Sequence, residues 1–101
     1  MSADKYTAIV DKGIADLIPT FMENRHKELA TLRTALASSD LEQMRGIGHR
    51  MKGSGNSYGF APISALGKMI EDAAKASDTA GIEARLAEYA DYLEKVKIVY
   101  E

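Results

Sequence analysis

Residues 82–100 read IEARLAEYADYLEKVKIVY, and their large apolar side chains recur at intervals that alternate between four and three residues. The series consists of Ile82, Leu86, Tyr89, Leu93, Val96 and Tyr100. A stripe of this period follows one side of an α-helix and is typical of the seam along which the helices of a left-handed bundle pack. The stretch therefore predicts a C-terminal helix that reaches Tyr100 and belongs to a helical bundle.

Three earlier segments carry a helical period as well. The first is expected from about Pro19 to Ala37, because proline suits the first turn of a helix. The second is expected from Leu41 to about Tyr58. Asp40 is a good N-cap for this second helix, Gln43 completes a capping box, and Gly59 is a natural C′ residue.

The third segment opens at Pro62, although Ala61 before it is a poor N-cap. Residues 6–16 are expected to form either a short extra helix or an extended lead-in. Four amphipathic helices joined by short links make antiparallel neighbours. The sequence thus predicts an all-α, up-down-up-down four-helix bundle.

Composition limits the classes of protein to which the chain can belong. Its 101 residues are expected to form a single domain, residues 1–101. The net charge of −2 argues against nucleic acid or an anionic membrane as the main partner. We find no signal peptide and no run of about 18 apolar residues that could span a membrane.

The chain contains no cysteine, which excludes disulfides, thiol nucleophiles and thiolate metal sites. A cysteine-free chain suits a reducing compartment, so we expect the cytoplasm.

Five glycines surround one histidine in residues 46–60, GIGHRMKGSGNSYGF. On a wheel of about 100° per residue, His49 lies on the face opposite the apolar residues and points away from the bundle. Gly48 and Gly55 fall on the core side, where they allow a neighbouring helix or a bulky side chain to come close. These two glycines are therefore expected to be structural.

Gly46 and Gly53 instead lie beside His49 on the outer face, where packing does not explain them. Each costs about 1 kcal/mol relative to alanine in a helix interior. Because helical side chains lean toward the N-terminus, a side chain at residue 53 would lie over the imidazole. The glycines are therefore expected to keep the ring accessible.

Lys52 follows His49 by three residues, so the two side chains are surface neighbours. We expect the ammonium group to disfavour the imidazolium form and so to keep a nucleophilic, neutral ring. It can also neutralise an anion that arrives at the ring. An accessible imidazole beside a cation indicates a phosphoryl acceptor.

Arg45, Gly46 and Asn56 flank His49 on the wheel and are candidates for contact with a phosphoryl group or a partner, although ordinary solvation is an equal alternative for Arg45 and Asn56. His26 lies in the charged run ENRHKE without a small neighbour and is expected to be a solvated surface residue. The two histidines are on different helices without companion ligands, so we expect no metal site.

The segment HRMKGSGNSYGF resembles the signature of histidine phosphotransfer (HPt) domains of two-component phosphorelays. That signature is a histidine, a Lys-Gly pair three and four residues later, and then a small residue. Here these are His49, Lys52, Gly53 and Ser54. Residues 19–36, PTFMENRHKELATLRTAL, resemble the family's first bundle helix, and residues 67–78, GKMIEDAAKASD, resemble its third.

The resemblance implies a phosphocarrier in which His49, through Nε2, accepts a phosphoryl group from a receiver-domain phospho-aspartate and passes it to another receiver aspartate. It further implies that Lys52 stabilises the phosphoryl group and that Gly53 keeps access open. The implied partners are response-regulator receiver domains and a hybrid sensor kinase, and the receiver brings the Mg²⁺. We expect no cofactor on this chain itself, and a monomer.

No ATP-binding glycine motif is present, so the chain is not expected to be a kinase. Two alternatives stay open. One is a binding module that docks on a partner without carrying phosphate, and the other is a purely structural bundle.

Overall fold

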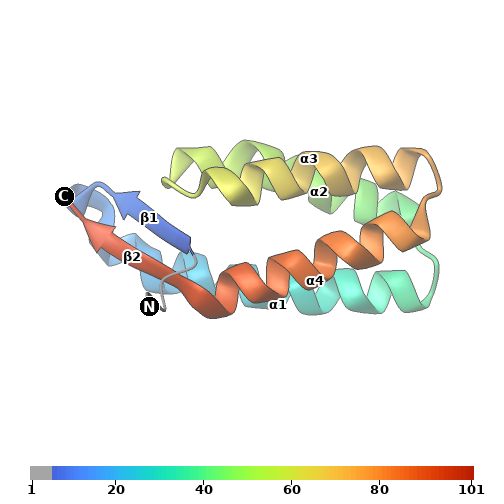
Figure 1. Ribbon diagram of the computed structural model, residues 1–101, viewed down its shortest axis with the longest axis horizontal. Helices are drawn as coiled ribbons and strands as arrows, with labels where there is room; N and C mark the ends of the chain where they lie inside the picture. The colour runs from blue at the N-terminus through green and yellow to red at the C-terminus, as the bar shows by residue number, and fades with distance from the viewer. Residues whose placement is uncertain (1–5) are drawn as a thin grey trace.

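A computed structural model describes residues 6–101 of the chain. In chain order it contains strand β1 (Tyr6–Val10), the 3-10 helix η1 (Lys12–Leu17), helices α1 (Ile18–Ala37), α2 (Leu41–Ser57), α3 (Ala61–Lys75) and α4 (Thr79–Lys95), and strand β2 (Val96–Tyr100). The four α-helices run lengthwise beside one another, and the two strands lie together at one end (Figure 1). The predicted four-helix bundle is confirmed, with a small sheet added to it.

The three connections between the α-helices share one backbone geometry. Each passes through a residue with positive φ, namely Ser39, Gly59 or Ser77. After α2, the N–H of Phe60 donates to the carbonyl oxygen of Gly55 at 2.8 Å and that of Gly59 donates to Asn56 at 3.2 Å. This is the Schellman pattern, and it confirms the predicted C′ role of Gly59. Connections this short keep successive helices antiparallel.

Asp40 caps α2 as predicted, because its carboxylate accepts a hydrogen bond from the N–H of Gln43 at 3.1 Å. The other half of the predicted capping box is wrong. The N–H of Asp40 donates to the carbonyl oxygen of Ala35 at 2.8 Å, in the helix that the chain has just left. The backbone thus supplies the partner that the side chain of Gln43 was expected to supply.

Helix α3 begins at Ala61, one residue earlier than the predicted start at Pro62. Its N-cap is Phe60, which has no side-chain cap, so Ala61 is not the N-cap. The ring of Phe60 is fully buried and stacks on Phe21 of α1 with centroids 5.2 Å apart. At this helix start the sequence supplies a core side chain instead of a polar cap.

Helices α2 and α3 pack backbone to backbone. A Cβ added at Gly48 would lie 2.7 Å from both the backbone nitrogen of Glu71 and the carbonyl oxygen of Gly67. One added at Gly55 would lie 2.6 Å from the backbone nitrogen of Ser64. The predicted structural role of Gly48 and Gly55 is therefore confirmed, and Gly67 contributes to the same close contact from α3.

The prediction for the C-terminal stretch is right through residue 95 and wrong beyond it. Ile82, Leu86, Tyr89 and Leu93 are buried in the core. Helix α4 then ends at Lys95, and β2 pairs in parallel with β1 from Tyr6↔Val96 to Val10↔Tyr100. Residues 96–100 are mostly β-branched or aromatic, which favours a strand once a partner strand is available.

The N-terminal segment also differs from the prediction. Residues 6–10 are extended, as one of the two alternatives has it, but they form a paired strand and not merely a lead-in. Residues 12–17 form a short 3-10 helix that leads into α1. The expected extra helix is therefore present only as this single short segment.

Candidate functional site

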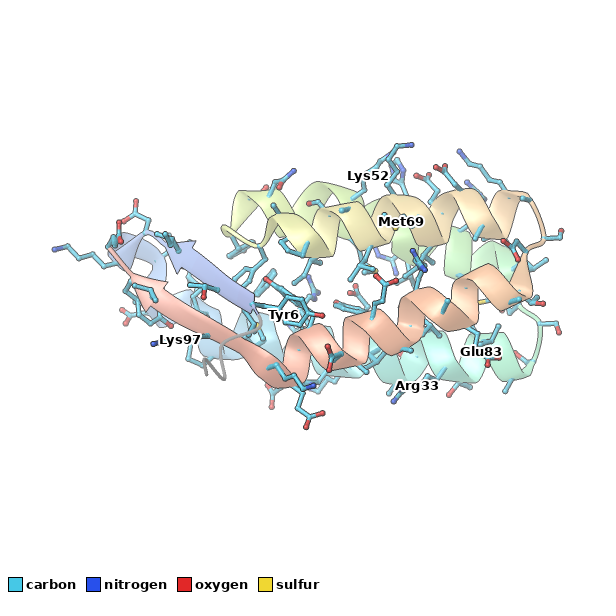
Figure 2. The ribbon with its side chains drawn as sticks, viewed as in Figure 1. Tyr6, Arg33, Lys52, Met69, Glu83 and Lys97 are labelled. Carbon is cyan, nitrogen blue, oxygen red and sulfur yellow. The ribbon has the colours of Figure 1, made fainter. Side chains whose placement is uncertain are left out.

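His49 projects from the outer face of α2. Its side chain is 65% exposed, whereas Met44, Ile47 and Met51 of the same helix are buried. The orientation agrees with the helical wheel. Figure 2 shows Lys52, three residues further along α2, directed away from the bundle.

A buried carboxylate on α3 joins these two side chains. Glu71 Oε2 lies 3.0 Å from His49 Nδ1, and Glu71 Oε1 lies 3.0 Å from Lys52 Nζ. Lys75 Nζ is 3.8 Å from Oε2. Glu71 is only 4% exposed, so an inward-lying acid binds two outward-lying groups. Glu71 is not among the site residues predicted from the sequence.

The close approach of α2 and α3 places Glu71 beneath His49. Gly48 directly precedes His49 and lies against the backbone nitrogen of Glu71. On α3, Gly67 precedes Glu71 by one helical turn and faces the backbone of Lys52. The sequence does contain a signal for Glu71. Gly67 lies inside a helical pattern, and an acid follows it four residues later, next to the apolar stripe.

The charge of Glu71 determines which nitrogen of the ring is protonated. The hydrogen bond from Lys52 is the main cause that lowers the pKa of the Glu71 carboxyl, burial opposes it, and the bond to His49 lowers the pKa further. Glu71 is therefore ionised at neutral pH and can only accept hydrogen bonds. In the neutral ring, Nδ1 must then carry the proton, and Nε2 keeps its lone pair.

This geometry changes the expected role of Lys52. From sequence alone, Lys52 and His49 are expected to act as a pair in which the cation keeps the ring neutral by repulsion. The structure places the carboxylate of Glu71 within 3.0 Å of each side chain. The three groups form one cluster, so His49 and Lys52 are not an isolated pair.

The surface beside the ring is open. A Cβ added at Gly53 would have no atom within 4 Å, and one added at Gly46 would meet only Arg50 Nη1, at 3.8 Å. Neither glycine is required by packing, in contrast to Gly48. The outer surface around His49 therefore has room for an approaching group.

The other candidate residues have different surroundings. Arg45 pairs with Glu42 on its own helix, with Nε 3.0 Å from Oε1. Asn56 is exposed, two helical turns beyond His49, and its backbone N–H donates to Ser64 Oγ at 2.8 Å. His26 is exposed on α1, as expected.

The described residues contain neither a candidate metal cluster nor a candidate membrane span. Within residues 6–101, no group of three or more His, Cys, Asp or Glu side chains is arranged to hold a metal ion. In the same part of the chain, none of the helices has both the length and the apolarity needed to cross a bilayer.

Comparison with known proteins gave a match at the level of the family. Neither a curated protein nor a solved structure matches the chain. Residues 16–98, which include the whole bundle and the His49 cluster, match the family model described as the Hpt domain. The chain therefore belongs to the Hpt domain family, whose members are histidine phosphotransfer intermediates of two-component phosphorelays and not kinases.

Proposed function

We propose that His49 is the residue that carries the phosphoryl group, and that residues 1–101 act as a single domain in this transfer. Nε2 attacks the phosphorus of a receiver phospho-aspartate, the N–P bond forms, and the bond from phosphorus to the aspartate oxygen breaks. The aspartate leaves as a carboxylate. Attack by the aspartate of a second receiver on phosphohistidine reverses these bond changes and frees the imidazole.

The observation that carries this proposal is an exposed ring whose Nδ1 is held by a buried acid. The His49 side chain is 65% exposed, and Glu71 is bonded to the nitrogen that does not react. Nε2 is thereby presented as a lone pair toward solvent. Phosphoryl transfer depends mainly on such positioning and on charge neutralisation, so little further machinery is required.

Each neighbour of the ring has a proposed task. Lys52 neutralises charge on the incoming phosphoryl oxygens, for which its ammonium group lies on the same surface as the ring. Gly53 keeps the approach clear. Glu71 is a positioning residue, because it acts through the imidazole and does not touch the phosphoryl group.

Receiver domains are the partners that the family implies in general. We propose further that a hybrid sensor kinase supplies the phosphate, that the receiver holds the Mg²⁺, and that the exchange takes place in the cytoplasm. Arg45, Gly46 and Asn56 flank His49 along α2 and are proposed to contact the docked receiver.

The test is to incubate the chain with a phosphorylated receiver domain and to follow acid-labile, base-stable phosphate on each protein. Wild type should become labelled and should lose the label to a second, unphosphorylated receiver. His49→Gln should remain unlabelled, whereas the matched control His26→Gln should behave as wild type. Equal labelling of His49→Gln would remove His49 from the reaction.

The alternative of a binding module makes a different prediction. A module of that kind would bind the receiver equally well with or without His49, and no variant would take up phosphate. Binding measured in parallel with labelling therefore separates the two functions.

A further inference from the structure

The sheet at the end of the bundle has an outer edge formed by β2. Among residues 6–101 the sheet contains only β1 and β2. In the predicted helix through Tyr100, the N–H groups of residues 96–100 would bond within the helix. A strand instead presents a row of N–H and C=O groups on its open side.

The hydrogen bonds at the sheet end define which groups face outward. The N–H of Glu101 donates to Val10 at 3.0 Å, and the N–H of Lys12 donates to the carbonyl of Glu101 at 2.9 Å. The backbone of Glu101 therefore faces β1. Because backbone groups alternate along a strand, those of Ile98 and Tyr100 point away from β1.

The two edges of the sheet differ in their surroundings. On the β1 side, the connection between α2 and α3 lies close, since a Cβ added at Gly59 would be 2.9 Å from the carbonyl oxygen of Ile9. On the β2 side, Tyr100 is 43% exposed. The edge that is left for another strand is that of β2.

We propose that β2 of a second copy of this chain pairs with this edge in antiparallel fashion about a two-fold axis at Ile98. A two-fold interface joins the same patch of both copies, so the strand must be complementary to itself. In this register Ile98 faces Ile98 of the other copy. Val96 faces Tyr100 of the other copy on the same side of the sheet, and such pairs of β-branched and aromatic side chains stabilise sheets.

Charge complementarity supports the same register. Lys95 directly precedes β2 and Glu101 directly follows it, so the two-fold axis places each beside the other residue of the second copy. Both side chains are exposed. Lys95 also pairs with the half-buried Asp91 on its own helix at 2.7 Å. Parallel pairing of the two copies would instead bring like charges together.

The proposed contact leaves the phosphoacceptor surface free. Figure 2 labels Lys97 on β2 at one end of the molecule and Lys52 on the far side of the bundle, well away from it. The dimer therefore does not depend on the role proposed for His49, and each can fail without the other.

The experiment measures oligomeric state by sedimentation velocity on the full chain. One strand edge makes a small interface, so the series should extend to about 0.5 mM protein. Wild type should dimerise with rising concentration. Lys95→Glu and Glu101→Lys should each weaken the dimer at least about tenfold, because like charges then face one another.

Two combinations restore opposite charges and are the decisive controls. The double variant Lys95→Glu with Glu101→Lys should dimerise as wild type does. An equimolar mixture of the two single variants should form a mixed dimer. A wild type that stays monomeric throughout, or single variants that dimerise as well as wild type, would overturn the proposal.

A backbone variant provides an independent check. Ile98→Pro removes one outward N–H and none that faces β1, so it should abolish the dimer, while Ile98→Val should not. Far-UV circular dichroism confirms that each variant is folded. Unchanged dimerisation of a folded Ile98→Pro protein would also overturn the proposal.

Discussion

Glu71 Oε2 lies 3.0 Å from His49 Nδ1, although the acid is buried on α3 and the imidazole is exposed on α2. The residue proposed to react is therefore oriented from the interior of the bundle and approached from outside. This arrangement depends on Gly48 and Gly67, which allow the two helix backbones to touch. The packing of the bundle and the chemistry of its surface are thus linked at one pair of helices.

Replacing Glu71 tests the positioning role. In Glu71→Leu the ring loses the acceptor that fixes its tautomer, and phosphoryl transfer to His49 should slow by about tenfold or more. Glu71→Gln keeps an oxygen acceptor for Nδ1 and should retain most of the rate. Rapid-quench measurement of transfer from a phosphorylated receiver checks both variants. Equal rates in Glu71→Leu and wild type would contradict the role.

Lys52→Ala should slow phosphoryl transfer by about tenfold, because a cation beside the transferred group is lost at an exposed position. Lys68→Ala is the matched control. Lys68 is also an exposed lysine, but it pairs with Asp72 on the outer side of α3. The control should leave the transfer rate unchanged, and a similar loss in both variants would point to net charge instead of to Lys52 itself.

Substitution of Gly53 separates clearance from helix stability. Gly53→Ala should raise the free energy of unfolding by about 1 kcal/mol, since alanine favours a helix and the added methyl group meets nothing within 4 Å. Gly53→Gln should be similarly folded but should slow transfer, because its longer side chain extends toward the ring. Urea unfolding and transfer rates on both variants check this. Undiminished transfer in Gly53→Gln would refute the clearance argument.

Gly48→Ala should have the opposite effect on stability. Its methyl group would lie 2.7 Å from backbone atoms of α3, which cannot move aside as a flexible side chain can. We expect a net loss of about 1 to 3 kcal/mol in the free energy of unfolding. Gly46→Ala is the control on the same helix and should be neutral or stabilising. Urea denaturation distinguishes the two, and equal stabilities would show that the helices separate easily.

The lowered pKa of Glu71 predicts an acid-dependent loss of stability. In the unfolded chain this carboxyl titrates near 4.5, and in the folded protein it titrates below that value. Its contribution is complete above about pH 4.5 and is lost as the pH falls through the folded-state pKa. The difference in unfolding free energy between wild type and Glu71→Gln should therefore shrink between pH 7 and pH 3.

The difference between wild type and Glu71→Gln is used because Glu28 also makes the unfolding free energy depend on pH. Burial is the main cause that raises the pKa of the Glu28 carboxyl, so its own contribution changes with pH in the opposite direction. Since Glu28 is present in both proteins, its effect cancels in the comparison. A difference that does not depend on pH would contradict the ion pairs assigned to Glu71.

The helical bundle could be predicted because its signals are local. The periodic apolar positions, Asp40 as an N-cap and Gly59 at C′ each depend on neighbours within a few residues. The sheet could not be predicted in this way. Val96 and Tyr100 continue the helical spacing, and only the presence of β1, at the other end of the chain, makes a strand the better state.

The site was predictable to a similar extent. His49, Lys52 and Gly53 lie on one face of one helix, so a wheel brings them together. Glu71 is 22 residues from His49 and reaches it only because two helices pack unusually closely. Periodicity within one helix contains no information about such a partner.

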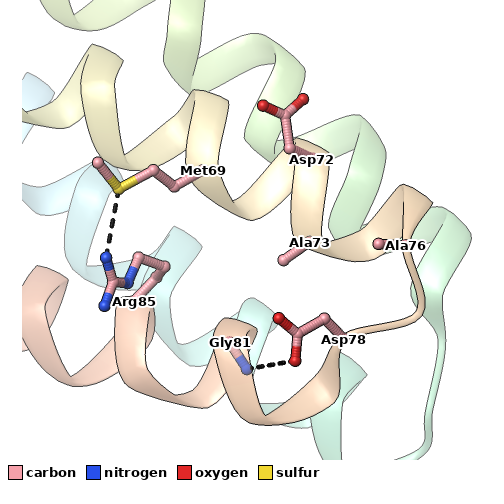
Figure 3. Close-up of a pocket in the computed structure, with 7 residues that line it drawn as sticks. All are labelled: Met69, Asp72, Ala73, Ala76, Asp78, Gly81 and Arg85. Atoms are coloured by element: carbon pink, nitrogen blue, oxygen red, sulfur yellow. Dashed lines mark hydrogen bonds between the residues drawn. The ribbon is translucent and has the colours of Figure 1, made fainter.

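The groove between α3 and α4 shows how the rest of the bundle differs from the α2–α3 contact. Met69 and Arg85 meet across it, with Arg85 Nη1 3.4 Å from the sulfur, and the acids Asp72 and Asp78 line it (Figure 3). A groove remains between these two helices, whereas the glycines of α2 and α3 bring those two backbones into contact. Tight helix packing is thus concentrated where it positions Glu71.

The parallel strands also have a consequence for the order of folding. Each pair in the sheet joins residues 90 positions apart, as in Tyr6↔Val96, whereas the helices are joined through turns of a few residues. Closing so long a loop carries a large entropic cost. Formation of the bundle lowers that cost, because it first brings the chain ends near one another. We therefore expect the amides of the strands to gain protection from hydrogen exchange last during refolding, and to lose it first in the native state.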